Sequence, residues 1–210
     1  MTNRKIDLYP SVFSFQSLDL GSEIKKFDFL TSALHLDMID GIYIKNFGLP
    51  FYIIRMIKMH TNKPIHIHTM MFLDNFIDEI IALSPTIVFF HFDSIINLDR
   101  MNDKCNKCGI TMCPVVSDYE ETKIAKTRFQ FDTVLFMTVK PGLPRQKFIK
   151  SKILELQKIH SHFPELNIIV DGGINASNLQ IIMEYIGGAV VGSCLYKDDL
   201  SFLRGISKPF

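Results

Sequence analysis

The chain has 210 residues, of which 47% are hydrophobic and 21% are charged, and this composition predicts a folded protein with a substantial core rather than a disordered one. The formal net charge of +1 gives no electrostatic footprint for nucleic acid or an anionic membrane, so neither partner is expected. No apolar run approaches the roughly 20 residues of a membrane span, and the first residues lack the apolar core of a secretion signal, so we expect a cytoplasmic protein.

Short apolar segments with the length of β-strands recur along the chain, and each is followed by a segment that can form a helix. Strands are predicted at 6–12, 33–39, 65–71, 86–92, 110–116, 133–139, 168–171 and 189–192. Helices are predicted within 14–32, from Pro50 through Ile57, along 73–81, around Cys105, after Asp118, along 149–163, from Asn175 or Ser177 to Ile186, and from Asp198.

The repeat length identifies the fold class. Eight strand–helix units over 210 residues average about 26 residues each, which is typical of a compact (β/α)8 TIM barrel. An open doubly wound sheet is the competing arrangement, but no GxGxxG motif follows the first strand. No linker or low-complexity tract interrupts the series, so we expect residues 1–210 to form a single barrel domain.

Cys105 and Cys108 form a CxxC motif, which can indicate redox or zinc chemistry. The spacing of Leu98, Met101 and the two thiols is helical, however, and Gly109 provides a helix stop. No second CxxC or CxxH accompanies the motif at zinc-finger spacing. We therefore expect both thiols to be reduced and to lie on the buried stripe of one helix.

Ionisable side chains occur in three otherwise apolar strands. His35 and Asp37 stand two residues apart in the segment LHLDMIDG, so a strand directs both to one face, and His66 and His68 repeat this pattern. Asp171 ends the apolar run NIIVD. If the strands are neighbours in a parallel sheet, His35, Asp37, His68 and Asp171 converge at its carboxyl end, where an unpaired charge would be costly. We predict a site there for one divalent metal ion per subunit, with Zn²⁺, Fe²⁺, Mn²⁺ or Co²⁺ all suited to these ligands.

Two carboxylates at such a site indicate proton transfer. If Asp37 and Asp171 lie on opposite sides of a flat substrate, one can remove a proton from carbon and the other can return a proton to the opposite face. The metal would polarise the adjoining carbonyl. Removal of a proton beside a ketone, with inversion at that carbon, is the reaction that this set of residues predicts.

Glycines at two late strand ends favour a phosphate group on the substrate. Gly172 and Gly173 follow the seventh strand, and Gly192 and Ser193 follow the eighth. Barrels commonly bind phosphate at these loops through backbone N–H groups, which requires no lysine and agrees with the neutral net charge. Either pair could instead only make a tight turn.

These segments together resemble the ribulose-phosphate 3-epimerase family. The chain carries counterparts of the family's opening Pro-Ser (Tyr9-Pro-Ser11), its H-x-D-x-M-D-G (LHLDMIDG), its H-L-M (His68-Thr-Met70), its M-S-V-x-P-G (Met137 to Gly142), its V-D-G-G-I and its closing Gly192-Ser193. The motifs occur in the family's order along most of the chain.

The resemblance implies a role for each matching residue. It makes His35, Asp37, His68 and Asp171 the metal ligands, with Asp37 and Asp171 as the catalytic acid/base pair. It implies a substrate site formed by Ser11, Met70, Met137, Gly142, Gly172, Gly173, Gly192 and Ser193. The implied reaction interconverts ribulose 5-phosphate and xylulose 5-phosphate, so the expected partner is a small sugar phosphate. Barrels of this family often associate, which would make the protein a homo-oligomer.

The chain also departs from the family pattern. Ile39 replaces a methionine, Ile44-Lys45-Asn46 stands for V-P-N, and His66 replaces an aspartate. The glycine-rich P-G-F-G-G-Q loop reads Pro141-Gly-Leu-Pro-Arg-Gln146, so Pro144 and Arg145 are expected to stiffen or redirect this loop. His91 stands at the family's strand-four His-x-Glu, where an internal hydrogen bond and a supporting role at the site are both consistent with the pattern.

These departures keep three alternatives in view. A hexulose-phosphate 3-epimerase, for example one acting on allulose 6-phosphate, would retain the chemical core and change the surrounding shell. A non-catalytic sugar-phosphate binder would have less reason to keep paired acids. A decarboxylase of the same barrel type would need a lysine in a D-x-K-x-x-D pattern, where this chain has Asp37-Met-Ile-Asp40.

Overall fold

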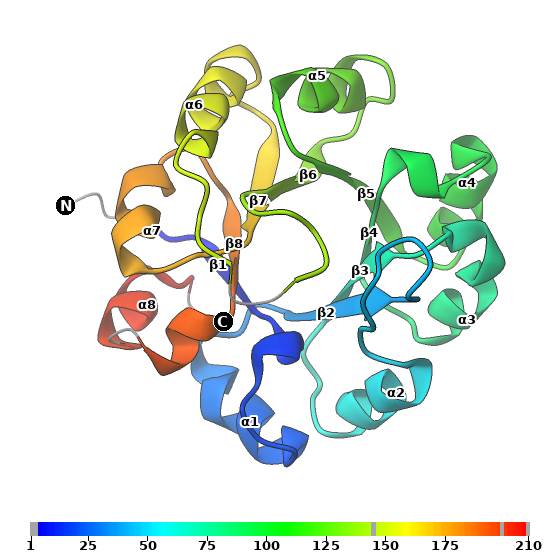
Figure 1. Ribbon diagram of the computed structural model, residues 1–210, viewed down its shortest axis with the longest axis horizontal. Helices are drawn as coiled ribbons and strands as arrows, with labels where there is room; N and C mark the ends of the chain where they lie inside the picture. Colours follow the sequence, from blue (N-terminus) through cyan, green and yellow to red (C-terminus); the bar gives the residue numbers. More distant parts are fainter. Residues whose placement is uncertain (1–3, 144–145, 198–199, 209–210) are drawn as a thin grey trace.

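The computed structural model describes residues 4–143, 146–197 and 200–208. In these residues, parallel strands alternate with helices throughout (Figure 1). The strands are β1 (Asp7–Pro10), β2 (Leu34–Ile39), β3 (Ile65–Met70), β4 (Ile87–Phe90), β5 (Thr111–Val116), β6 (Thr133–Met137), β7 (Asn167–Asp171) and β8 (Gly188–Val191). The α-helices are α1 (Leu20–Phe27), α2 (Phe51–Met59), α3 (Ile77–Ala82), α4 (Leu98–Lys107), α5 (Tyr119–Thr127), α6 (Lys152–His162), α7 (Ala176–Ile182) and α8 (Leu200–Ile206).

The strands form one eight-stranded sheet in the order β1-β8-β7-β6-β5-β4-β3-β2. The sheet curls round so that β1 and β2 meet, with the helices as an outer ring (Figure 1). A parallel bridge between Ser11 and His35 joins the two edges, and the Ser32 N–H donates to the Leu8 carbonyl at 2.9 Å. The predicted (β/α)8 barrel is therefore confirmed, and the open doubly wound sheet is wrong.

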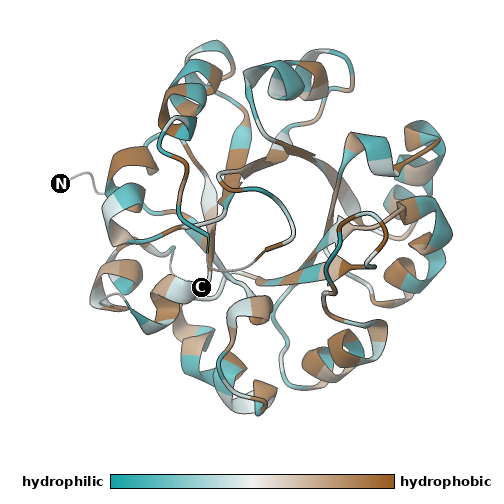
Figure 2. Ribbon diagram, in the orientation of Figure 1, coloured by the Kyte–Doolittle hydropathy of each residue, from teal (hydrophilic) through white to brown (hydrophobic). Residues whose placement is uncertain are grey.

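Both faces of the strands are apolar because both are covered. In β6, Val134 and Phe136 point outward and pack with Leu156 of α6, whereas Leu135 and Met137 point inward and help to fill the barrel. This alternation is the period-two geometry of a strand. The helices show the complementary pattern, with apolar residues on only part of their surface (Figure 2).

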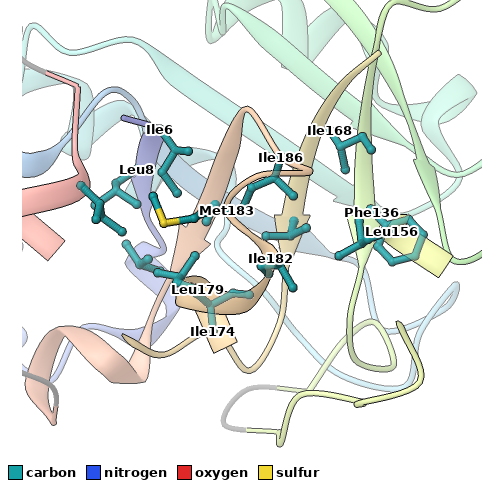
Figure 3. Packing of buried hydrophobic residues seen from close by; sticks show 14 of the residues in the cluster. Ile6, Leu8, Phe136, Leu156, Ile168, Ile174, Leu179, Ile182, Met183 and Ile186 are labelled. Atoms are coloured by element: carbon teal, nitrogen blue, oxygen red, sulfur yellow. The ribbon is translucent and has the colours of Figure 1, made fainter. Parts of the chain in front are cut away.

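Helix α7 illustrates how the outer ring is attached. Leu179 and Ile182 are fully buried, and Figure 3 shows them with Met183 packed beside the strands that carry Leu8 and Ile168. Burial of one such side chain contributes about 1.5–3 kcal/mol. The helix begins at a capping box between Asn175 and Asn178, so Asn175 rather than Ser177 is the cap.

Several predicted boundaries were wrong. Strand β4 ends at Phe90 instead of residue 92, and a short 3-10 turn over Leu73–Asn75 precedes α3. Helix α6 begins at Lys152, and Ile149 lies before it with 37% of its surface exposed. These errors occur where tertiary contacts, not local periodicity, decide where an element begins or ends.

The expectation for the CxxC motif was half right. Cys105 is buried in α4, and Gly109 has φ +71°, as a helix stop requires. Cys108, however, follows the last turn of α4 and is exposed, so only one thiol belongs to the buried stripe. The four cysteines, all within the described ranges, form no disulfide bond with one another. No helix within the described ranges has the length and apolar character needed to cross a bilayer.

Candidate metal and substrate site

Four ionisable side chains meet at the carboxyl end of the barrel strands. His35 and Asp37 are on β2, and Asp37 is in register with His68 on β3, so the pleat directs all three inward. Asp171 is the last residue of β7, which is separated from β2 in the closed barrel by β1 and β8. The convergence predicted from the sequence is therefore present.

The nitrogen and oxygen atoms of this cluster lie close together. Asp37 Oδ1 is 3.2 Å from His68 Nδ1 and 3.4 Å from His35 Nε2. Asp171 Oδ2 is 3.8 Å from His68 Nδ1 and 3.7 Å from His35 Nε2. One such atom from each residue lies within 4.8 Å of the others. Atoms bound to one ion at about 2.0–2.2 Å are at most roughly 4.4 Å apart, so these four contacts suit a shared cation.

The two histidines support the same conclusion from their burial. Both are 0% exposed, and neither His35 Nε2 nor His68 Nδ1 makes a hydrogen bond. A buried polar atom without a partner costs about 1–3 kcal/mol. A divalent cation would give both nitrogens a partner and would neutralise the two carboxylates, so the residues present fit a metal.

The carboxyl groups of Asp37 and Asp171 have opposite pKa shifts. Burial raises the pKa of Asp37, but His35 and His68 outweigh burial and hold it well below its usual range. Burial, together with the negative charge of Asp37, raises the pKa of Asp171. The pKa of His35 is raised because the two carboxylates outweigh the effect of its burial. The surroundings thus shift the pKa values of two chemically identical groups in opposite directions.

A pocket opens above this cluster at the carboxyl end of the barrel. Its wall includes Asp37, His68 and Asp171, while His35 lies beneath it. The predicted substrate-binding residues all line the same pocket: Ser11, Met70, Met137, Gly142, Gly172, Gly173, Gly192 and Ser193. Sequence reasoning missed other lining residues, including Phe13, Ser14, Ile39, Lys140, Leu143 and Gln146. Phe13, Ser14 and Lys140 gave no signal in the sequence, whereas Ile39, Leu143 and Gln146 were considered only as positions in the family's motifs.

Backbone conformation explains why glycines stand in this wall. Gly172 has φ +116°, and a Cβ atom there would lie 2.2 Å from Val139 Cγ2. Gly173 has φ +64°, and its Cβ would lie 2.3 Å from the backbone nitrogen of Phe148. Both positions therefore exclude larger residues, and they leave backbone beside the pocket with no side chain in between.

The loop after β6 is linked to the loop after β2. Asn46 Nδ2 donates a hydrogen bond to the Gly142 carbonyl at 2.6 Å, and Ile44 packs against Gly142. Gln146 Nε2 donates to the Leu143 carbonyl at 2.9 Å. Pro144 and Arg145, whose effect on the loop was predicted from the sequence, lie outside the described residues. The link through Asn46 was not predicted, because nothing in the sequence pairs these two loops.

Two more histidines lie near the cluster. His91, just after β4, places its Nε2 3.1 Å from His68 Nε2, and the two ring planes are only 26° apart with centroids separated by 5.3 Å, so the rings meet edge to edge. The internal contact considered for His91 is therefore present. His66 lies two residues before His68 on β3 and is in register with His35. Its ring packs against the Tyr9 ring, with centroids 4.8 Å apart. Burial and the neighbouring histidines lower the pKa of both His66 and His91 to about 3.

Solved structures of similar shape support the fold alone. Thiamine phosphate pyrophosphorylase from Pyrococcus furiosus aligns with a TM-score of 0.66 and 14% identity over 97% of this chain and 95% of its own. N-(5'-phosphoribosyl)anthranilate isomerase from the same organism aligns with a TM-score of 0.63 and 16% identity, covering 96% of each chain. Both similarities agree with the barrel described above.

Sequence comparison is more specific. The model of the ribulose-phosphate 3 epimerase family matches residues 7–196. Ribulose-phosphate 3-epimerase from Bacillus subtilis is 27% identical over 95% of this chain and 99% of its own length. The protein of that name from Buchnera aphidicola subsp. Baizongia pistaciae is 30% identical over 98% of this chain and 97% of its own. The chain therefore belongs to the ribulose-phosphate 3-epimerase family, and it is an isomerase of the sugar-phosphate epimerase type.

Proposed function

We propose that this chain, acting as one domain over residues 1–210, is a metal-dependent epimerase that interconverts ribulose 5-phosphate and xylulose 5-phosphate at C3. The observation that carries the proposal is the pair of carboxylates, Asp37 and Asp171, which reach one pocket from β2 and β7 beside two buried histidine nitrogens that make no hydrogen bond. The names of the relatives support the pentulose phosphate as substrate.

The metal ligands would be His35, Asp37, His68 and Asp171. Imidazole nitrogen with carboxylate oxygen suits Zn²⁺, Fe²⁺, Mn²⁺ or Co²⁺. When bound, the cation supplies positive charge that polarises the substrate carbonyl beside C3, which makes the C3 proton more acidic. His35 Nε2 and His68 Nδ1, which are buried, make no hydrogen bond and face the two carboxylates, support this assignment.

Asp37 and Asp171 act as the acid/base pair. One carboxylate removes the C3 proton, and the other, carrying a proton, delivers it to the opposite face of C3, so that the configuration inverts. The reverse reaction exchanges the two roles. The two carboxyl groups reach one pocket from different strands, β2 and β7, which supports this division. Ser11 Oγ donates to Asp37 Oδ2 at 3.3 Å and helps to orient it.

The remaining wall of the pocket binds the substrate. Met70 and Met137 contribute an apolar surface that limits the access of water to the reacting carbon. The phosphate is held by backbone N–H groups at the loop residues Gly142, Gly172, Gly173, Gly192 and Ser193. The exclusion of side chains at Gly172 and Gly173 supports this role.

Proton NMR in deuterated water tests the proposal directly. Metal-replete enzyme is mixed with ribulose 5-phosphate, and loss of the C3 proton signal is followed together with growth of xylulose 5-phosphate. Deuterium at C3 of the product at catalytic rates is the expected result. Product without deuterium would contradict proton exchange through Asp37 and Asp171.

A parallel reaction with allulose 6-phosphate decides the main alternative. Leu143, which lines the pocket and is 61% exposed, stands in the loop where the chain departs from the family pattern. A higher kcat/KM on the hexulose phosphate would assign the enzyme to that substrate. Stabilisation against heat by either sugar phosphate, without exchange or turnover in the presence of metal, would identify a binder.

A further inference from the structure

His35 and His68 differ in what contacts the ring nitrogen that faces away from the carboxylates. His68 turns Nδ1 toward the carboxylates, and its other nitrogen lies 3.1 Å from His91 Nε2. For His35, the nitrogen facing away from the carboxylates is Nδ1, which is buried and makes no hydrogen bond. A hydrogen-bonding side chain therefore stands behind only one of these two histidines in the described part of the chain.

The contact between His68 and His91 determines where their protons lie. A ring nitrogen that binds a cation carries no proton, so with Nδ1 on the metal the proton of neutral His68 is on Nε2. That N–H can be satisfied by His91 only if His91 Nε2 is a bare acceptor. The remaining proton of neutral His91 is then on its Nδ1. With a cation at His68 Nδ1, the two rings would therefore have complementary tautomers.

The surroundings hold His91 in this position. Its carbonyl accepts hydrogen bonds from both the backbone N–H of Ser94, at 3.0 Å, and Ser94 Oγ, at 2.7 Å. The ring of Tyr43 lies 5.4 Å from the His91 ring, and the Tyr43 hydroxyl donates to Asp93 Oδ1 at 2.5 Å. The backbone and one ring face of His91 are therefore both restrained.

We propose that His91 is a positioning residue of the metal site: its neutral ring, protonated on Nδ1, accepts the Nε2–H of His68 and so keeps His68 Nδ1 turned toward Asp37 and Asp171. The inference rests on the proposed function, because it concerns a ligand of the proposed metal. Partners of this kind usually are carboxylates or carbonyls, and their loss typically weakens metal binding 10–100-fold. An imidazole gives the same orientation without adding a negative charge.

Metal affinity, measured by competition with a chelator, tests the role of His91. In His91→Phe the ring is kept and the acceptor is lost, and we expect the Kd for Zn²⁺ to rise about 10–100-fold. In His91→Gln the amide oxygen can take the place of Nε2, and we expect most of the affinity to return. His66→Phe is the matched control: it removes another buried histidine of the barrel, and we expect it to leave the Kd within about threefold, since His66 lies outside the proposed ligand set.

The outcomes separate the inference from the proposed function. If the wild type binds Zn²⁺ and His91→Phe binds it equally well, the role of His91 is overturned and the metal site stands. If the wild type binds none of Zn²⁺, Fe²⁺, Mn²⁺ and Co²⁺, the metal site is overturned and the role of His91 with it.

A second measurement uses the wild-type protein, so it does not depend on whether the His91 variants fold. In long-range proton–nitrogen NMR spectra of the Zn²⁺-loaded wild type labelled with ¹⁵N-histidine, we expect His68 to be protonated on Nε2 and His91 on Nδ1. A proton on His91 Nε2 instead would overturn the inference.

Discussion

The two ends of the pocket are built in different ways. At the end proposed to bind metal, the metal end, the side chains of His35, Asp37, His68 and Asp171 converge from β2, β3 and β7. Their positions follow from the pleat of buried strands. At the end proposed to hold phosphate, the wall is backbone from the loops after β6, β7 and β8, and its shape depends on glycine conformations and on contacts between loops. Reactive side chains can therefore be placed by the local geometry of a strand, whereas the shape of a backbone surface depends on how distant segments pack.

The largest effect is expected at the metal end. Replacing Asp171 with Asn removes one member of the proposed acid/base pair while keeping its size, and general acid–base catalysis typically contributes 10²–10⁴-fold. We expect exchange of the C3 proton to fall by about this factor while the circular dichroism of the protein is unchanged. Full activity in this variant would show that Asp171 is not part of the acid/base pair.

Metal affinity should depend on pH in a defined direction. Because the pKa of His35 is raised above its usual value of about 6.5, the metal-free ring is protonated below the raised pKa, and the cation must displace that proton. We therefore expect the affinity to increase with pH, by up to about tenfold per pH unit, and to level off above the pKa of His35. Chelator competition between about pH 5.5 and 8 measures this, and a constant affinity would contradict it.

At the phosphate end, Gly173→Ala should act through shape. The left-handed φ of +64° and a Cβ 2.3 Å from the Phe148 nitrogen require the loop to move, at a cost of about 1–3 kcal/mol in the free energy of unfolding. We expect KM to rise about tenfold and kcat to change less, because phosphate binding is remote from C3.

Gly205→Ala provides the matched control, since this glycine lies in α8 and its Cβ would meet no atom within 4 Å. There the same substitution should raise the free energy of unfolding by up to about 1 kcal/mol without changing KM. Equal changes in KM and in the free energy of unfolding at the two glycines would show that the backbone conformation at Gly173 has no particular role in binding.

The smallest effect is expected for the link between loops. Asn46→Ala removes the donor to the Gly142 carbonyl and should raise KM severalfold with little change in kcat, since a net hydrogen bond contributes about 0.5–1.5 kcal/mol. Steady-state kinetics of Asn46→Ala beside Asn106→Ala, a change at an exposed position on α4, would test this. A loss confined to kcat would assign Asn46 to the chemistry instead of to binding.

By itself, the sequence determined the barrel and the convergence of the four candidate metal ligands. The apolar strands, their spacing and the alternation of side chains were sufficient to bring His35, Asp37, His68 and Asp171 together, because residues two apart on a strand share a face and parallel strands end at one edge. The glycines at 172 and 173 were likewise recognisable as pocket residues, since their positions follow the strand end directly.

Only the tertiary structure decided the contacts between segments that no periodicity relates. The contact between His91 and His68, the bond from Asn46 to Gly142 and the exposure of Cys108 each depend on how one loop or helix end lies against another. Local propensity carries no information on such pairs, because their energies arise from packing and hydrogen bonds made only after the barrel has closed. That is the physical reason why the convergence of the four side chains could be predicted from the sequence, whereas the contacts around them could not.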